Sequence, residues 1–131
     1  MAVNNPNLKP QERQALQTFL TDLQQEVSEQ LTLVALFGSK ARGDSQQSSD
    51  IDVLVILDRE DRDLRRSILR NAARVSLEHD VLLSPRVIGE ERWEEMRGFS
   101  LYRNVIRDAA RLEIQDGNLT IEPVDVVLST S

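Results

Sequence analysis

Two short apolar runs constrain the fold of this chain more than any other feature. They are Leu31–Phe37 and Val53–Leu57, and both are too short and too apolar for surface helices. We therefore predict two buried strands, at 31–37 and 51–57. The first run ends at Gly38, and a polar segment follows it, which predicts a turn and a loop between the strands.

Two carboxylates, Asp50 and Asp52, open the second run on either side of Ile51. Side chains alternate between the faces of a strand, so both carboxylates are predicted to point the same way while Ile51 points into the sheet. Carboxylate oxygens at this spacing are suitable ligands for magnesium. The sequence thus predicts a divalent-metal site at the start of this strand.

The turn before the loop has the residues that phosphate binding needs. Glycine at 38 lets the backbone approach phosphates, while the hydroxyl of Ser39 and the N–H groups of the turn favour anions. Lys40 and Arg42 add positive charge, and the planar guanidinium of Arg42 could hold a phosphate through two hydrogen bonds.

Gly38-Ser39, a ten-residue spacer and Asp50-Ile51-Asp52 together resemble the signature of the nucleotidyltransferase superfamily that includes DNA polymerase beta. In a chain this short the pattern is similar to the minimal nucleotidyltransferase (MNT) group, many of whose members are antitoxins of HEPN ribonuclease toxins. The resemblance is clear over 31–57 and extends through Asp80 and 101–105. It implies a polymerase beta-like α/β fold, with ATP as the substrate and Mg²⁺ as the cofactor.

Two magnesium ions that stabilise the attacking and leaving oxygens would need three carboxylates at one point. The third is expected from a neighbouring strand, and Asp80, which precedes the apolar pair Val81-Leu82, is the candidate by pattern and by resemblance. Glu78 is the second choice. Asp80 is also our candidate for the base that takes the proton of the acceptor hydroxyl.

The resemblance implies an antitoxin that transfers AMP from ATP to a hydroxyl, most plausibly of a tyrosine, on a cognate HEPN toxin. One alternative is an enzyme that adenylates a small molecule of the aminoglycoside type, although the chain has little beyond the core to bind a drug. Another is a non-catalytic antitoxin that acts by binding alone. The complete set of phosphate turn and carboxylates argues against the last of these.

Composition limits the remaining possibilities. The 131 residues suit a single domain, 1–131, with a core at about 10–113 and a tail at 118–131. The formal net charge of -6 makes direct binding of nucleic acid an unexpected function. The chain has no cysteine, which excludes thiol catalysis and zinc-thiolate sites. No signal peptide or membrane-spanning run is recognised, so a cytoplasmic protein is expected.

The rest of the chain predicts an α/β domain with a small mixed sheet, with the acids on adjacent strands and helices covering one face. Leu16, Phe19, Leu20, Leu23 and Val27 follow helical spacing after Pro10. The other predicted elements are helices at 59–77, 89–96 and 101–112, a strand at 79–88, a turn at 117–118 and a strand-like tail from Leu119, which is expected to add an edge strand or to contact a partner.

Four further features have a structural and a functional interpretation. Arg74 and His79 have the spacing of a HEPN ribonuclease motif, but we interpret this as coincidence because His79 falls where a strand is predicted. The arginines of helix 59–77 form a basic face that is more often solvated than functional. Trp93 is a candidate anchor at a protein interface, and Tyr102 is expected to be a core or interface residue rather than a nucleophile.

Overall fold

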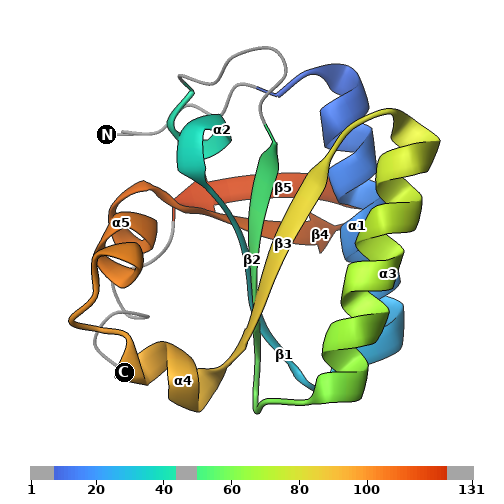
Figure 1. The fold of residues 1–131 in the computed structure, drawn as a ribbon. Coiled ribbons are helices and arrows are strands. Elements are labelled where there is room, and N and C mark those ends of the chain that lie inside the picture. The colour runs from blue at the N-terminus through green and yellow to red at the C-terminus, as the bar shows by residue number, and fades with distance from the viewer. Residues whose placement is uncertain (1–7, 44–49, 124–131) are drawn as a thin grey trace.

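The computed structural model describes residues 8–43 and 50–123. Within these ranges a single sheet has the strand order β3-β2-β1-β4-β5 (Figure 1). The elements are, in chain order, α1 (Pro10–Val27), β1 (Leu31–Phe37), α2 (Gly38–Arg42), β2 (Ile51–Leu57), α3 (Arg62–His79), β3 (Leu83–Gly89), α4 (Glu90–Glu95), α5 (Ser100–Asp108), β4 (Ala110–Gln115) and β5 (Asn118–Pro123).

The sheet is mixed, as the sequence predicts. β1 is antiparallel to both of its neighbours, β2 and β4, and β4 is antiparallel to β5. Only β2 and β3 are parallel, and α3 makes the crossover between them. β3 and β5 are therefore the two edges of the sheet.

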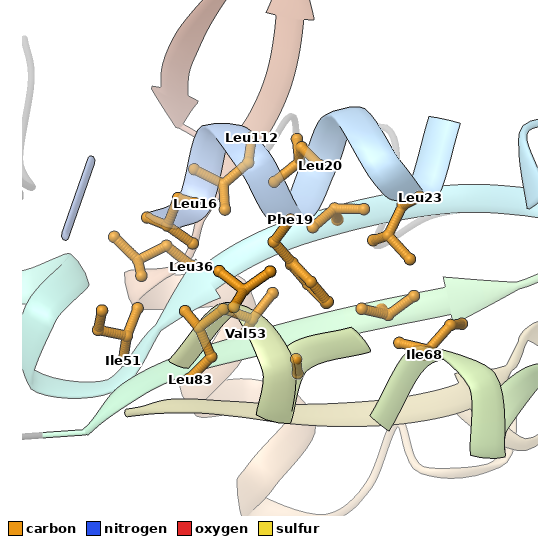
Figure 2. Packing of buried hydrophobic residues seen from close by; sticks show 14 of the residues in the cluster. Leu16, Phe19, Leu20, Leu23, Leu36, Ile51, Val53, Ile68, Leu83 and Leu112 are labelled. Atoms are coloured by element: carbon orange, nitrogen blue, oxygen red, sulfur yellow. The ribbon is translucent and has the colours of Figure 1, made fainter. Parts of the chain in front are cut away.

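One face of the sheet packs against α1 and α3. The predicted apolar stripe of α1 is fully buried there, and it meets residues from β1, β2, β3 and α3 (Figure 2). The first two strands and the start of α1 lie where the sequence predicts them. This layer holds β1 and β2 rigidly, and their adjoining ends carry Gly38 and the Asp50–Asp52 segment.

The other face is covered by α4 and α5, so the prediction that helices cover one face was wrong (Figure 1). Leu54 and Ile56 of β2 are buried on this second face, and they require an apolar cover there. Trp93 provides part of it, with 4% of its surface exposed and its ring centroid 4.5 Å from that of Tyr102. Trp93 is thus not an exposed anchor, whereas the prediction of Tyr102 as a core residue is confirmed.

Two predicted boundaries need correction. α3 begins three residues later than predicted, because the side chain of Asp61 accepts a hydrogen bond from the Leu64 N–H and caps the helix there. It also continues through His79, so β3 begins at Leu83 rather than at the histidine. His79 is the last helical residue, and Asp80 follows in the left-handed conformation.

The predicted helix at 101–112 is also too long. α5 ends at Asp108, and Ala110–Leu112 belong to β4, where they pair with β1 or β5. The turn at Gly117 is as predicted, and it leads into β5 as an edge strand. The described part of the tail thus forms β5, and residues 124–131 lie outside the described residues, so the role of the tail stays a prediction.

Candidate active site

The predicted phosphate turn lies directly against a predicted metal ligand. Phe37, the last residue of β1, is the register partner of Asp52 on β2, and Gly38 follows with a φ of +76°. A methyl group added at Gly38 would lie 2.5 Å from Oδ2 of Asp52. Only glycine therefore fits, both because of its left-handed φ and because the carboxylate leaves no room for a side chain.

Asp50 and Asp52 lie at the start of β2. Asp50 immediately precedes the strand and is exposed, and Asp52 is half-buried. Asp52 shares its face of the sheet with Leu54 and Ile56, opposite the face of Ile51. Both carboxylates are thus accessible at the end of the sheet where the glycine turn lies.

The structure does not bring Asp80 into one group with these two carboxylates. Asp80 caps the end of α3 with φ 54° and ψ 48°, is exposed, and accepts a hydrogen bond at its backbone carbonyl from the side chain of Gln11. In the described part of the chain, no three Asp, Glu, His or Cys side chains form a group that could hold a metal ion. The roles of Asp80 as third ligand and as base stay predictions. Glu78, the second choice, is paired with Arg74.

The two carboxylates alone are a suitable donor set for magnesium. Mg²⁺ is usually held by one or two protein carboxylates, with waters and substrate phosphates completing its octahedron. Asp50 and Asp52 supply two hard oxygen ligands, and the Gly38 backbone lies close to the carboxylate of Asp52. The residues present therefore fit the metal that the family implies.

Lys40 forms a buried ion pair with Glu12. Its side chain is 2% exposed, and its ammonium lies 2.7 Å from Oε2 of Glu12 on α1. Oε1 of the same carboxylate accepts the backbone N–H of Lys9 at 2.8 Å. The ammonium of Lys40 is therefore buried and paired with a carboxylate, and its contact with phosphate stays a prediction. The pair fastens α2, and with it the glycine turn, to α1.

The side chains of Ser39 and Arg42 lie outside the described part of the structure. Their phosphate contacts stay predictions.

A hollow of about 390 Å³ lies beside Asp52, and its lining includes Ser84 and Arg86, which were not predicted as site residues. Ser84 on β3 is the register partner of Asp52, and Arg86 follows two residues later on the same face. Arg65 of α3 reaches the same hollow from the other side of the β3 edge. The sequence contains a signal for these two positions. Leu83 and Val87 are apolar residues that a strand would bury on one face, so Ser84 and Arg86 must lie on the opposite face.

Arg74 belongs to a network of ion pairs on the surface, and His79 lies on the same helix rather than in the predicted strand. The guanidinium of Arg74 lies 2.7 Å from Asp22 and 3.1 Å from Glu78. The hydrogen bond with Asp22, and to a lesser extent the one with Glu78, raises the pKa of Arg74 above its ordinary value.

None of the helices in the described ranges is long and apolar enough to cross a membrane.

A glycine turn that ends one strand, set against a carboxylate that begins the neighbouring strand, is suited to the transfer of phosphorus-containing groups with a divalent metal. Comparison with known proteins gives the family: residues 16–127 match the nucleotidyltransferase domain, and this chain belongs to that family. The predicted nucleotidyltransferase family and its mixed α/β fold are thereby confirmed.

Two relatives in Methanocaldococcus jannaschii are provisionally named protein adenylyltransferases. MJ0604 is 30% identical over 97 residues, which cover 74% of this chain and 93% of the relative. MJ0141 is 39% identical over 72 residues, which cover 53% of this chain and 72% of the relative.

Solved structures with a similar fold include a toxin–antitoxin complex with AMP-PNP, with a TM-score of 0.47 and 22% identity over 72% of this chain and 70% of that chain. A mutant of the toxin–antitoxin MntA-HpeT has the same TM-score and coverages at 18% identity.

Proposed function

We propose that this protein is an antitoxin that transfers AMP from ATP to a hydroxyl of a partner protein, a tyrosine of a HEPN ribonuclease toxin. The observation that carries the proposal is the contact between the Gly38 turn and the carboxylate of Asp52, in a chain of the nucleotidyltransferase family. The names of the two archaeal relatives support a protein as the acceptor. The MNT resemblance of the sequence supports a toxin as that protein.

The reaction makes and breaks one bond at phosphorus. The tyrosine oxygen attacks the α-phosphorus of ATP, the bond from that phosphorus to the bridging oxygen of the β-phosphate breaks, and pyrophosphate leaves. The hydroxyl proton passes to a base, for which Asp80 is our candidate. Asp80 borders a surface hollow that shares Ser84 and Pro85 with the hollow beside Asp52, so a substrate seated there would span both.

The protein's share of this chemistry is positioning. Asp50 and Asp52 would hold Mg²⁺, which supplies neutralising charge to the phosphates when it is bound. The Gly38 turn lets the triphosphate approach the backbone beside Asp52, and Ser39 and Arg42 are proposed to hold its oxygens. Hydrogen-bond donors fixed before the reaction lower its barrier because they need no reorganisation during it.

Suppression of toxicity separates the enzyme from a binding-only antitoxin. The protein encoded beside this gene would be expressed with the wild type, with Asp50→Asn/Asp52→Asn, and with a control, Asp58→Asn/Asp63→Asn, which removes two exposed carboxylates elsewhere. We expect growth with the wild type and the control, and growth arrest with Asp50→Asn/Asp52→Asn despite an intact complex. Equal protection by all three variants would refute the catalytic proposal in favour of binding alone.

A further inference from the structure

Three hollows that share lining residues follow the edge of the sheet between α3 and β3. The hollow beside Asp52 shares Leu69, Ser84 and Pro85 with a larger hollow of about 690 Å³ at the end of α3, where Asp80 lies. In the opposite direction it shares Arg65, Arg86 and Val87 with a hollow of about 400 Å³ that reaches α4 and α5. We call these three connected hollows the α3–β3 groove, and Asp52 lies in its middle section.

The large apolar side chains that are exposed in the described part of the chain all line the groove. Four large apolar side chains are exposed in residues 8–43 and 50–123, and all of them line it: Leu69 (39% exposed), Leu77 (86%), Leu82 (56%) and Phe99 (64%). Three lie at the Asp80 end and Phe99 lies at the other end. An exposed apolar cluster rimmed by polar groups is typical of a protein contact surface.

The groove also contains three arginines for which the described part of the chain provides no partner. Arg65, Arg86 and Arg92 are exposed, and none of them makes a side-chain hydrogen bond or ion pair with the residues that the structure describes. Arg74 and Arg97, by contrast, are paired with acids on the surface. Two of these arginines, Arg65 and Arg86, share the hollow of Asp52, and such a concentration of cations in a chain of net charge -6 favours an acidic ligand.

We propose that the α3–β3 groove docks the acceptor segment of the partner protein, and that this segment carries apolar side chains on one side of the modified hydroxyl and acidic side chains on the other. The inference rests on the proposed function and names the chemistry of its acceptor. A protein segment is favoured over nucleic acid because apolar side chains form the end of the groove near Asp80. The arginines contact the acidic part, and the leucines contact the apolar part.

The dimensions suit an extended segment. Leu82 to Ile88, which follow the groove along the sheet edge, span about 20 Å at roughly 3.3 Å per residue. Arg86 lies two residues beyond Ser84, the partner of Asp52, and so about 7 Å further along the same face. A segment with its hydroxyl at Asp52 would therefore place an acid two residues away within reach of Arg86.

The test measures the binding of fluorescein-labelled peptides of about 12 residues with a central tyrosine. One peptide has leucines before the tyrosine and glutamates after it, a second has lysines in place of the glutamates, and a third has serines in place of the leucines. Each is titrated with the wild type, Arg65→Glu/Arg86→Glu and Leu77→Ser/Leu82→Ser. The matched control is Arg66→Glu/Arg70→Glu, which reverses two exposed charges on α3 that line none of the three hollows.

We expect the leucine–glutamate peptide to bind the wild type at least tenfold tighter than the lysine peptide. Arg65→Glu/Arg86→Glu should reverse that preference, Leu77→Ser/Leu82→Ser should weaken binding several-fold, and the control should stay within twofold of the wild type. Equal binding of the two charged peptides, or an equal loss in the control, would overturn the inference. So would displacement of the peptide by a lower concentration of a single-stranded RNA of similar length.

Two further readouts separate this inference from the proposed function. Loss of ATP affinity in Arg65→Glu/Arg86→Glu, with unchanged peptide affinity, would assign the arginines to the nucleotide and overturn the docking role. Peptide binding, together with no AMP transfer to the partner protein in the presence of Mg²⁺ and ATP, would retain the groove and refute the enzyme. Transfer that is insensitive to all groove variants would retain the enzyme and refute the groove.

Discussion

Lys40 and Glu12 form a buried ion pair, and replacing either partner alone should be among the costliest single substitutions outside the apolar core. The two side chains are 2% and 6% exposed, and Nζ lies 2.7 Å from Oε2. At that distance Coulomb's law gives roughly 6 kcal/mol at an effective dielectric constant of 20, before the cost of desolvating both charges. Removing one partner leaves the other charge buried and unpaired, at an expected cost of about 3–5 kcal/mol.

A double-mutant cycle tests this reasoning. Lys40→Met keeps most of the side-chain stem, and Glu12→Gln keeps an oxygen to accept the Lys9 N–H. Each single variant should lower the free energy of unfolding by about 3–5 kcal/mol, and the double variant should cost at least about 2 kcal/mol less than the sum because it leaves no buried charge. Urea unfolding followed by circular dichroism gives these values.

With an m value of up to about 3 kcal/mol/M, each single variant should lower the urea midpoint by at least about 1 M. Two results would refute the reasoning: a cost below about 1 kcal/mol for Lys40→Met, or strictly additive costs in the double variant. Since the pair fastens α2 to α1, Lys40→Met should also weaken the binding of ATP with Mg²⁺ under conditions where the protein stays folded.

Three other predictions follow from single positions. Gly38→Ala places a methyl group 2.5 Å from Oδ2 of Asp52 at a φ of +76°, so it should reduce the rate of AMP transfer at least tenfold. Gly98→Ala is the control and should retain the wild-type rate, because no atom lies within 4 Å of the added methyl group. Asp61→Ala should lower the free energy of unfolding by about 1 kcal/mol, and Asp61→Asn should lower it by much less because asparagine retains the capping oxygen. Equal losses for the two variants in urea unfolding would contradict the capping role of Asp61. Tyr102→Phe should be neutral or slightly stabilising by the same assay, since its buried hydroxyl has no partner in the described chain; a loss above about 1 kcal/mol would reveal a hidden hydrogen bond.

The first half of the fold was predictable because its determinants are local. The apolar stripe of α1 and the two runs that become β1 and β2 need only the periodicity of the sequence. The juxtaposition of Gly38 and Asp52 was predictable for the same reason, since they flank the loop between two strands that pair as neighbours. Short-range sequence patterns are therefore sufficient to predict that the turn at Gly38 lies close to Asp50 and Asp52.

The features that escaped prediction depend on contacts between distant segments. Glu12 and Lys40 are 28 residues apart, and only the packing of α1 against α2 reveals that the lysine is buried. Residues 110–112 continue a helical pattern in the sequence but become strand because β1 and β5 offer hydrogen-bonding partners. Arg65 and Arg86 share a hollow only because β3 forms the edge of the sheet.

The central claim is that this protein attaches AMP to another protein, and intact mass spectrometry tests it most directly. The protein encoded beside this gene would be purified with the wild type or with Asp50→Asn/Asp52→Asn, incubated with Mg²⁺ and ATP, and weighed. We predict one or more added AMP units on the partner with the wild type and none with the variant. An unchanged partner mass in a stable wild-type complex would contradict the claim.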